Sequence, residues 1–193
     1  YSHVAILGAG AWGTALAAIA ARAGRRVTLW GRNGSLLVDI STGENPRYLP
    51  GVELPEDISV TSSLAVAAGG EFVILAAPAQ ATRALLKELV PLLAKGTPLM
   101  LSAKGIEQNS GKLLPEILAE EAPGHPVAIL SGPSFAREVA SGLPTAVTIA
   151  AEAALAQEAR RHTAAYPRIF ATSAREKLGL DELRAHLAAL AAY

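Results

Sequence analysis

The chain has 193 residues, enough for one large domain or for one domain with a fragment of another. Its 17 Lys and Arg residues balance 17 Asp and Glu residues, so no basic excess points to nucleic acid. The absence of cysteine excludes disulfides, thiolate catalysis and cysteine-bound zinc, and it fits a cytoplasmic protein. The apolar run at residues 15–21 ends at Arg22, so we expect no membrane span, and we expect no signal peptide. Four scattered histidines lack metal-ligand spacing, and we expect them to be surface or incidental residues: His3, His125, His162 and His186.

The first predicted strand, at residues 4–7, leads into a glycine-rich turn and then a helix at residues 14–22. The turn reads Gly8-Ala9-Gly10-Ala11-Trp12-Gly13, which is G-x-G-x-x-G in the strand–turn–helix context that a dinucleotide requires. The first glycine permits the tight turn, the second lets the backbone approach a pyrophosphate, and the third lets helix and strand pack closely. Free N–H groups at the helix N-terminus suit the anion. The alternative is an ordinary strand–turn–helix whose glycines serve packing alone.

A second strand is predicted at residues 26–30, after Gly24 ends the first helix as its C-cap. In dinucleotide folds, the residue just past this strand meets the adenosine ribose. A carboxylate there suits the 2′-hydroxyl of NAD, and an arginine suits the 2′-phosphate of NADP. Arg32 stands here without an acidic neighbour, so the sequence accepts NAD or NADP and slightly favours NADP. A solvated turn arginine is the competing interpretation.

The rest of the chain alternates strands with helices. After a short helix at residues 35–40 comes a polar, proline-rich loop at residues 43–55, which Tyr48 and Leu49 are expected to pack near the adenosine. Further strands are predicted at residues 59–62, 71–77, 98–102, 126–130, 145–150 and 168–172. Further helices are predicted at residues 64–68, 82–93, 113–121, 135–140, 153–164 and 181–192. This alternation predicts a Rossmann-type, doubly wound α/β fold of three layers with a mainly parallel sheet.

Such sheets bind ligands beyond the carboxyl ends of their strands, and several polar or glycine-rich segments follow predicted strand ends. Besides the glycine turn and Arg32, they are Pro78, Lys104 and Gly132-Pro133-Ser134. We interpret Lys104 as a cation at a buried edge that binds a phosphate or polarises a carbonyl, the alternative being a solvated loop lysine. Backbone N–H groups and the Ser134 hydroxyl form a second possible anion site, unless Ser134 simply caps the next helix. The set indicates a dehydrogenase acting on a small phosphorylated substrate.

Several motifs follow one another in the order and spacing of a known family. They are GAGAWGTA at residues 8–15, LWGR at 29–32, ENPRYLP at 44–50, AKGIE at 103–107, LSGPSFA at 130–136 and GLPTA at 142–146. Over residues 3–152 the chain resembles the N-terminal domain of bacterial NAD(P)-dependent glycerol-3-phosphate dehydrogenase, a family that interconverts sn-glycerol 3-phosphate and dihydroxyacetone phosphate. The resemblance implies cofactor contacts for Ala11, Trp12, Arg32, Lys104 and Ala136. It implies substrate contacts for Lys104, Gly132 and Ser134. With the residue-level reasoning, the expected cofactor set is Gly8, Gly10, Ala11, Trp12, Gly13, Arg32, Pro78, Lys104 and Ala136.

The resemblance ends near residue 152. The family continues into a helical domain whose first helix carries a lysine followed by asparagine, and that lysine is the general acid/base. No Lys-Asn pair follows residue 152 here, where the only lysine is Lys177, so we assign no catalytic residue. Residues 153–193 are instead similar to the C-terminal end of a small ribosome-biogenesis GTPase, in AAYP at 164–167, ATSAR at 171–175 and GLDELR at 179–184. The chain has no phosphate-binding G-x-x-x-x-G-K-[ST], so GTPase function is not expected.

We interpret the whole chain, residues 1–193, as a single domain whose tail completes the sheet after a junction near residues 152–160, engineered or natural. One hypothesis is an NAD(P)-binding domain with weak or no turnover, since the catalytic helical domain is missing, and a homodimer is considered for it. A second is an engineered chimeric scaffold with incidental or no cofactor binding. A third is an enzyme that takes its lysine from a partner subunit.

Overall fold

Seven strands form one sheet in the order β5-β2-β1-β6-β7-β8-β9 within the part of the chain that the structure, a computed structural model, describes: residues 1–132, 134–143, 145 and 147–151. The strands are β1 (His3–Leu7), β2 (Arg26–Trp30), β5 (Ile58–Thr61), β6 (Phe72–Leu75), β7 (Leu99–Leu101), β8 (Val127–Ser131) and β9 (Thr148–Ala151). Neighbours from β5 to β8 pair parallel, and β8 pairs antiparallel with β9. The direction of winding reverses between β1 and β6, which places a ligand crevice beyond their carboxyl ends.

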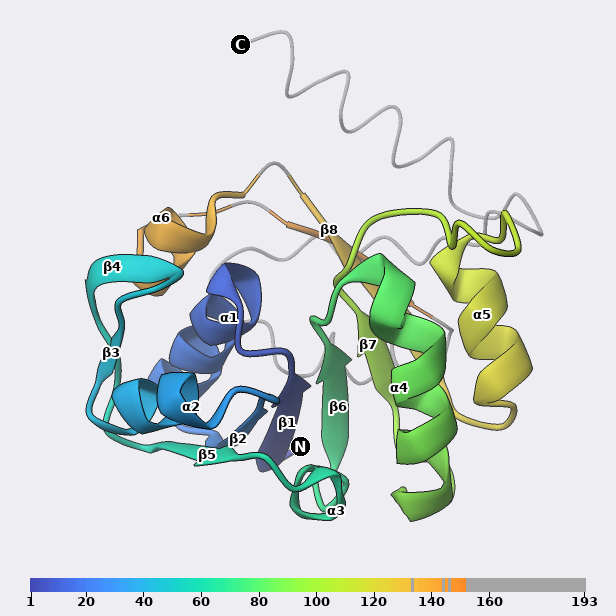
Figure 1. Cartoon of the computed structure of the whole chain (residues 1–193), viewed down its shortest axis with the longest axis horizontal. Coiled ribbons are helices and arrows are strands. Elements are labelled where there is room, and N and C mark those ends of the chain that lie inside the picture. The colour runs from blue at the N-terminus through green and yellow to red at the C-terminus, as the bar shows by residue number, and fades with distance from the viewer. Residues whose placement is uncertain (133, 144, 146, 152–193) are drawn as a thin grey trace, which may run out of the picture.

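Helices cover both faces of this sheet (Figure 1), so the expected three-layer α/β fold is confirmed. They are α1 (Ala11–Arg22), α2 (Gly34–Ser41), α3 (Leu64–Ala67), α4 (Thr82–Leu89), α5 (Leu114–Glu121) and α6 (Ala136–Ala140), with 3₁₀ turns η1 (Ala79–Ala81) and η2 (Val90–Leu92). One apolar cluster joins α1, α2 and α6 to the face of β1 that carries Val4 and Ile6. The other joins α4 and α5 to the face that carries Ala5 and Leu7. Among the described residues, no helix is long and apolar enough to cross a membrane.

The first strand and helix owe their geometry to short local signals. All five residues of β1 are buried, as expected of an apolar strand covered on both faces. After α1, Gly24 takes a φ of +72°, and its N–H donates to the carbonyl oxygen of Ala21 at 2.8 Å while the N–H of Arg25 donates to that of Ala20 at 3.0 Å. These two bonds form a Schellman cap, in which a glycine adopts the left-handed conformation without strain.

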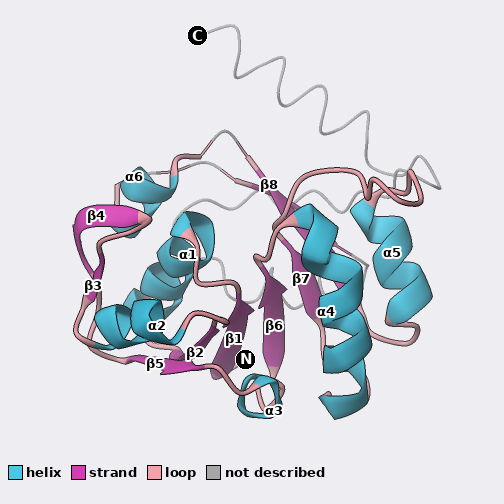
Figure 2. Cartoon of the chain, viewed as in Figure 1, coloured by secondary structure: helices cyan, strands magenta, loops and turns pink. Residues whose placement is uncertain are grey.

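The segment at residues 43–55 is not the loop that the sequence suggested. It forms a small antiparallel sheet of β3 (Glu44–Asn45) and β4 (Leu49–Glu53), seen beside α2 and α6 in Figure 2. Leu49 is only 3% exposed and packs into the α1–α2 cluster, whereas Tyr48 is 43% exposed, and their expected place near an adenosine stays a prediction. The hairpin is stabilised by tertiary burial, because its strands are too short and too rich in proline to be stable alone.

Other departures from the predicted elements are smaller. The predicted helix at residues 82–93 is α4 followed by η2, with Pro91 within η2, and the strand expected at residues 145–150 is β9 at Thr148–Ala151. His3 is 7% exposed, so the surface position expected of it is wrong. Its Nε2 lies 2.9 Å from Thr28 Oγ1 and its Nδ1 lies 3.1 Å from the carbonyl oxygen of Gly69. The helices and strand predicted after residue 152 lie outside the described residues.

Candidate functional site

An open cleft of about 760 Å³ lies at the carboxyl ends of the strands. This volume lies within the range of small-molecule and cofactor sites, about 300–1,000 Å³. Five strand ends and one hairpin contribute to its wall: Gly8–Trp12, Trp30–Asn33 with Leu36, Tyr48, Ala76–Ala79, Ser102–Lys104 and Leu130–Ala136 without residue 133. Every cofactor or substrate residue predicted from the sequence lines this cleft except Gly13.

The glycine turn is packed tightly at two positions and open at the third. Gly8 has a φ of +130°, and a Cβ there would lie 2.7 Å from the backbone of Ala76. A Cβ at Gly13 would lie 1.8 Å from the carbonyl oxygen of Gly8, so α1 can pack this closely against the turn only because Gly13 has no side chain. A Cβ at Gly10 would meet nothing within 4 Å. Gly10 therefore presents bare backbone to the cleft.

The same turn begins α1. Gly10 is its N-cap, with φ −76°, and its carbonyl oxygen accepts the N–H of Thr14 at 2.9 Å. No side chain among the described residues caps the helix, and its first turn carries no acidic residue. The first N–H groups of α1 and its positive dipole end are therefore left to face an anion in the cleft.

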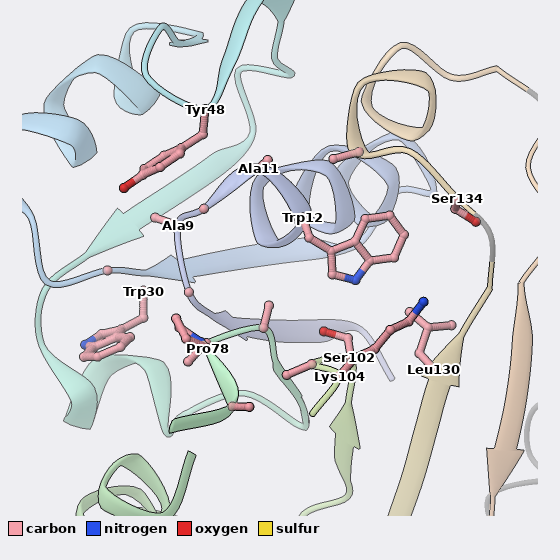
Figure 3. Close-up of a pocket in the computed structure, with 18 of the residues that line it drawn as sticks. Ala9, Ala11, Trp12, Trp30, Tyr48, Pro78, Ser102, Lys104, Leu130 and Ser134 are labelled. Carbon is pink, nitrogen blue, oxygen red and sulfur yellow. The ribbon is translucent and has the colours of Figure 1, made fainter. Parts of the chain in front are cut away.

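The end of β2 forms one wall of the cleft. Arg32 is exposed there, and Asn33 caps α2 by accepting the N–H of Leu36 at 3.2 Å. Trp30 is half-buried, and its Nε1–H donates to the carbonyl oxygen of Ser62 at 3.1 Å. Tyr48 reaches the same end from the hairpin (Figure 3). This end of the cleft therefore combines a cation with two aromatic faces.

The opposite end of the cleft is lined by Lys104, Gly132 and Ser134. Lys104 Nζ donates to the carbonyl oxygen of Gly132 at 3.2 Å, which joins the ends of β7 and β8. Figure 3 shows Lys104, Trp12 and Ser134 on this side of the cleft, away from Tyr48 and Trp30. Lys104 is exposed, so its expected position at a buried edge is wrong. The N-cap of α6 is Phe135, so Ser134 lies one residue outside the capping position considered for it.

The loop that follows Lys104 is held by side chains from η1 and α4. Gln80 Nε2 donates to the carbonyl oxygen of Ile106 at 2.8 Å, and its Oε1 accepts the N–H of Gln108 at 3.0 Å. Arg83 Nε donates to Glu107 Oε1 at 2.9 Å. The Arg83 guanidinium, and then the Ser110 hydroxyl, hold the pKa of the Glu107 carboxyl below its usual range.

Sequence reasoning missed several residues of this site. Trp30 and Phe135 line the cleft, and the only signal for them was their position beside a strand end. Gln80 and Arg83 meet the Lys104 loop across more than twenty residues of sequence, which no local pattern reveals. Within the described ranges, no group of three His, Asp or Glu side chains could hold a metal ion.

The fold and the cleft together define the class of protein domain. The chain contains a Rossmann-type α/β domain, with a glycine-rich turn at the N-terminus of α1 and an open cleft at the switch point between β1 and β6. The family described as "NAD-dependent glycerol-3-phosphate dehydrogenase N-terminus" matches residues 3–157. The chain belongs to this family.

Individual relatives agree with this membership. The chain is 50% identical over 163 residues to a glycerol-3-phosphate dehydrogenase [NAD(P)+] of Parvibaculum lavamentivorans, covering 84% of the chain and 49% of the relative. It is 55% identical over 152 residues to the protein of that name from Bradyrhizobium sp. (strain ORS 278), covering 78% and 46%. The solved glycerol-3-phosphate dehydrogenase of Coxiella burnetii superposes with a TM-score of 0.78 at 34% identity, covering 87% and 53%. The chain thus spans about half the length of these relatives.

Proposed function

We propose that this chain binds NAD or NADP in the cleft and forms the cofactor half of a glycerol-3-phosphate dehydrogenase site. The observation that carries the proposal is the shape of the glycine turn, which is closed by backbone at Gly8 and Gly13 and open to the cleft at Gly10. A pyrophosphate needs this close approach together with the free N–H groups of a helix N-terminus. Both are present at one point of the cleft wall.

The cofactor's orientation follows from the two ends of the cleft. Arg32 and Tyr48 suit an adenosine ribose and its base, while Lys104 and Ser134 lie at the end left for the reacting groups. Because Arg32 has no carboxylate beside it in the sequence, a 2′-phosphate is favoured over a free 2′-hydroxyl. We therefore propose a slight preference for NADP.

The substrate proposed is a small phosphorylated alcohol or ketone, sn-glycerol 3-phosphate or dihydroxyacetone phosphate. Lys104 supplies a cation at the β7 end, and Gly132 and Ser134 supply polar groups at the β8 end. A bound nicotinamide would supply the hydride acceptor or donor. Lys104 would hold the substrate phosphate or oxygen near it, with Pro78 and Ala136 shaping the cofactor's place.

Turnover by the 193-residue polypeptide is proposed to be weak. Among the described residues that line the cleft, no carboxylate and no histidine is present to take up a proton. The sequence also lacks the Lys-Asn pair after residue 152. General acid–base catalysis contributes about 10²–10⁴-fold, and poor positioning of the substrate would reduce the rate further.

One titration tests the proposal. NADPH at a hundred times its dissociation constant should stabilise the folded chain by about 2.7 kcal/mol, which a thermal shift detects, and its fluorescence should change on binding. Lys104→Ala should leave NADPH binding measurable and remove the further shift caused by dihydroxyacetone phosphate. No response to millimolar NADPH or NADH would overturn the proposal in favour of the scaffold hypothesis. Rapid oxidation of sn-glycerol 3-phosphate would overturn the weak-turnover part, and a dimer in that case would support a lysine supplied by a partner subunit.

A further inference from the structure

Asn45, the last residue of β3, is a buried amide whose hydrogen bonds join separate parts of the cleft wall. It is 1% exposed. Its Nδ2 donates to Thr14 Oγ1 at 2.8 Å and to the carbonyl oxygen of Ala9 at 3.3 Å. Its Oδ1 accepts the N–H of Tyr48 at 3.1 Å. Both amide hydrogens and the carbonyl oxygen are therefore engaged.

Packing alone does not explain this residue. The surrounding cluster is apolar and includes Leu49, Val52 and Leu54 from the hairpin. An apolar side chain of the same size would fill the space without the desolvation cost of an amide. Shaping the hairpin tip does not explain it either, because that requires only the Oδ1 bond to Tyr48. The two bonds from Nδ2 reach the glycine turn and α1, more than thirty residues away in sequence.

The bond to Ala9 fixes the orientation of a peptide group. The structure has no cis peptide bond among its described residues, so the Ala9 carbonyl and the Gly10 N–H point in opposite directions from one peptide plane. Asn45 and Thr14 hold the carbonyl on the buried side, where Thr14 is 0% exposed. The Gly10 N–H is thereby turned toward the open cleft.

The hydrogen bond from the Tyr48 N–H to Asn45 Oδ1 fixes the part of the cleft wall that the hairpin forms. Ala9 and Tyr48 both line the cleft, one in the glycine turn and the other at the hairpin tip. A single buried side chain bonds to the main chain of both. We propose that Asn45 is a positioning residue. Its hydrogen bonds hold the glycine turn, which would bind the pyrophosphate, in a fixed position relative to the part of the cleft wall formed by Tyr48, which we call the Tyr48 wall. This inference rests on the proposed binding of an adenine dinucleotide.

Two ligand fragments separate the two effects. Adenosine reports on the Tyr48 wall alone, whereas ADP adds the diphosphate that the Gly10 N–H would bind. Asn45→Ala should weaken ADP binding by about tenfold, the value of one hydrogen bond to a charged group. It should weaken adenosine binding less. In a Tyr48→Ala background, Asn45→Ala should no longer change adenosine binding but should still weaken ADP binding, because only the turn remains to be disturbed.

The control is Thr97→Val, which removes a partly buried hydrogen bond, from Thr97 Oγ1 to the carbonyl oxygen of Ala94 at 2.7 Å, ahead of β7 and away from the cleft. It should lower the melting temperature without changing the affinity for either fragment. If Asn45→Ala is too unstable to titrate, Thr14→Val removes the hydroxyl partner instead, and it should weaken ADP binding about threefold while sparing adenosine.

Calorimetric titration of the full 193-residue chain gives a clear decision. ADP binding by Asn45→Ala within twofold of wild type, or additive effects of Asn45→Ala and Tyr48→Ala on adenosine, would overturn the inference alone. A loss of affinity in Thr97→Val as large as in Asn45→Ala would also overturn it, since stability would then explain both. A wild-type chain that binds neither ADP nor NADPH would overturn the proposed function together with this inference.

Discussion

The three glycines of the turn should respond differently to the same substitution. The structure leaves open space around Gly10, with nothing within 4 Å of an added Cβ. At Gly13, an added Cβ would lie 1.8 Å from the carbonyl oxygen of Gly8. Because that oxygen belongs to the backbone, no side-chain rotation relieves the overlap. Replacement by alanine should therefore separate binding from folding within a single turn.

Magnitudes follow from these contacts. In Gly10→Ala, a weaker N-cap costs at most about 1 kcal/mol, and the reduced entropy of the unfolded chain offsets about 0.4–1 kcal/mol. The melting temperature should then stay within about 3 °C of wild type. NADPH affinity should fall at least tenfold, about 1.4 kcal/mol, because the methyl group occupies the pyrophosphate's place. Gly13→Ala should lose about 3 kcal/mol or more of folding stability, which is a drop of about 6–12 °C.

Thermal melts without ligand and NADPH titrations followed by fluorescence test both parts. Gly34→Ala is a matched control, because a Cβ at Gly34 also meets nothing within 4 Å but Gly34 does not line the cleft. It should keep wild-type affinity. The reasoning is refuted if Gly10→Ala binds NADPH within twofold of wild type, or if Gly13→Ala melts at the same temperature as Gly10→Ala.

Three further predictions concern charge and packing. Arg32→Ala should lower NADPH affinity at least tenfold and NADH affinity little, and equal losses in parallel titrations would argue against a 2′-phosphate contact. Because Arg83 and Ser110 lower the pKa of Glu107, their stabilisation is complete above the ordinary glutamate pKa of about 4.3 and is lost as the pH falls through the lowered folded-state pKa. Urea melts at pH 7 and pH 3 should therefore differ less for Glu107→Gln than for wild type, and an unchanged difference would contradict this. Leu86 is 0% exposed, so Leu86→Ala should cost about 2–5 kcal/mol in urea melts, with unchanged NADPH affinity in the folded fraction.

Local patterns were sufficient for most of the described fold. β6 and residues 4–7 of β1 are continuous apolar runs, and such runs have few alternatives to a buried strand. Pro115 was expected in the first turn of its helix and is found there in α5. The β3–β4 hairpin escaped prediction because its stability comes from contacts with α1 and α2, which are distant in sequence. The single domain expected over residues 1–193 remains a prediction, since residues 152–193 are not described.

The candidate site could likewise be predicted only in part from the sequence. The rule that parallel strands end at one edge was enough to collect Arg32, Lys104 and Ser134 around one cleft. It could not indicate that Lys104 contacts the Gly132 carbonyl, nor that Gln80 supports the loop beyond it. Those contacts depend on side-chain reach across neighbouring strands and helices, which has no periodic signature in the sequence.

The charges around the cleft give a physical reason for binding to be separable from turnover in this chain. The charged side chains that line it, within the described residues, are Arg32 and Lys104, and both are cations. Cations at its two ends would attract the phosphates of the proposed cofactor and substrate, although the chain as a whole has no net charge. Hydride transfer to or from an alcohol also needs a group that takes up or supplies a proton, and the described residues that line the cleft include no carboxylate and no imidazole. The groups that favour anion binding are therefore distinct from the proton-transfer group that the proposed reaction would need, so affinity and turnover should be measured separately.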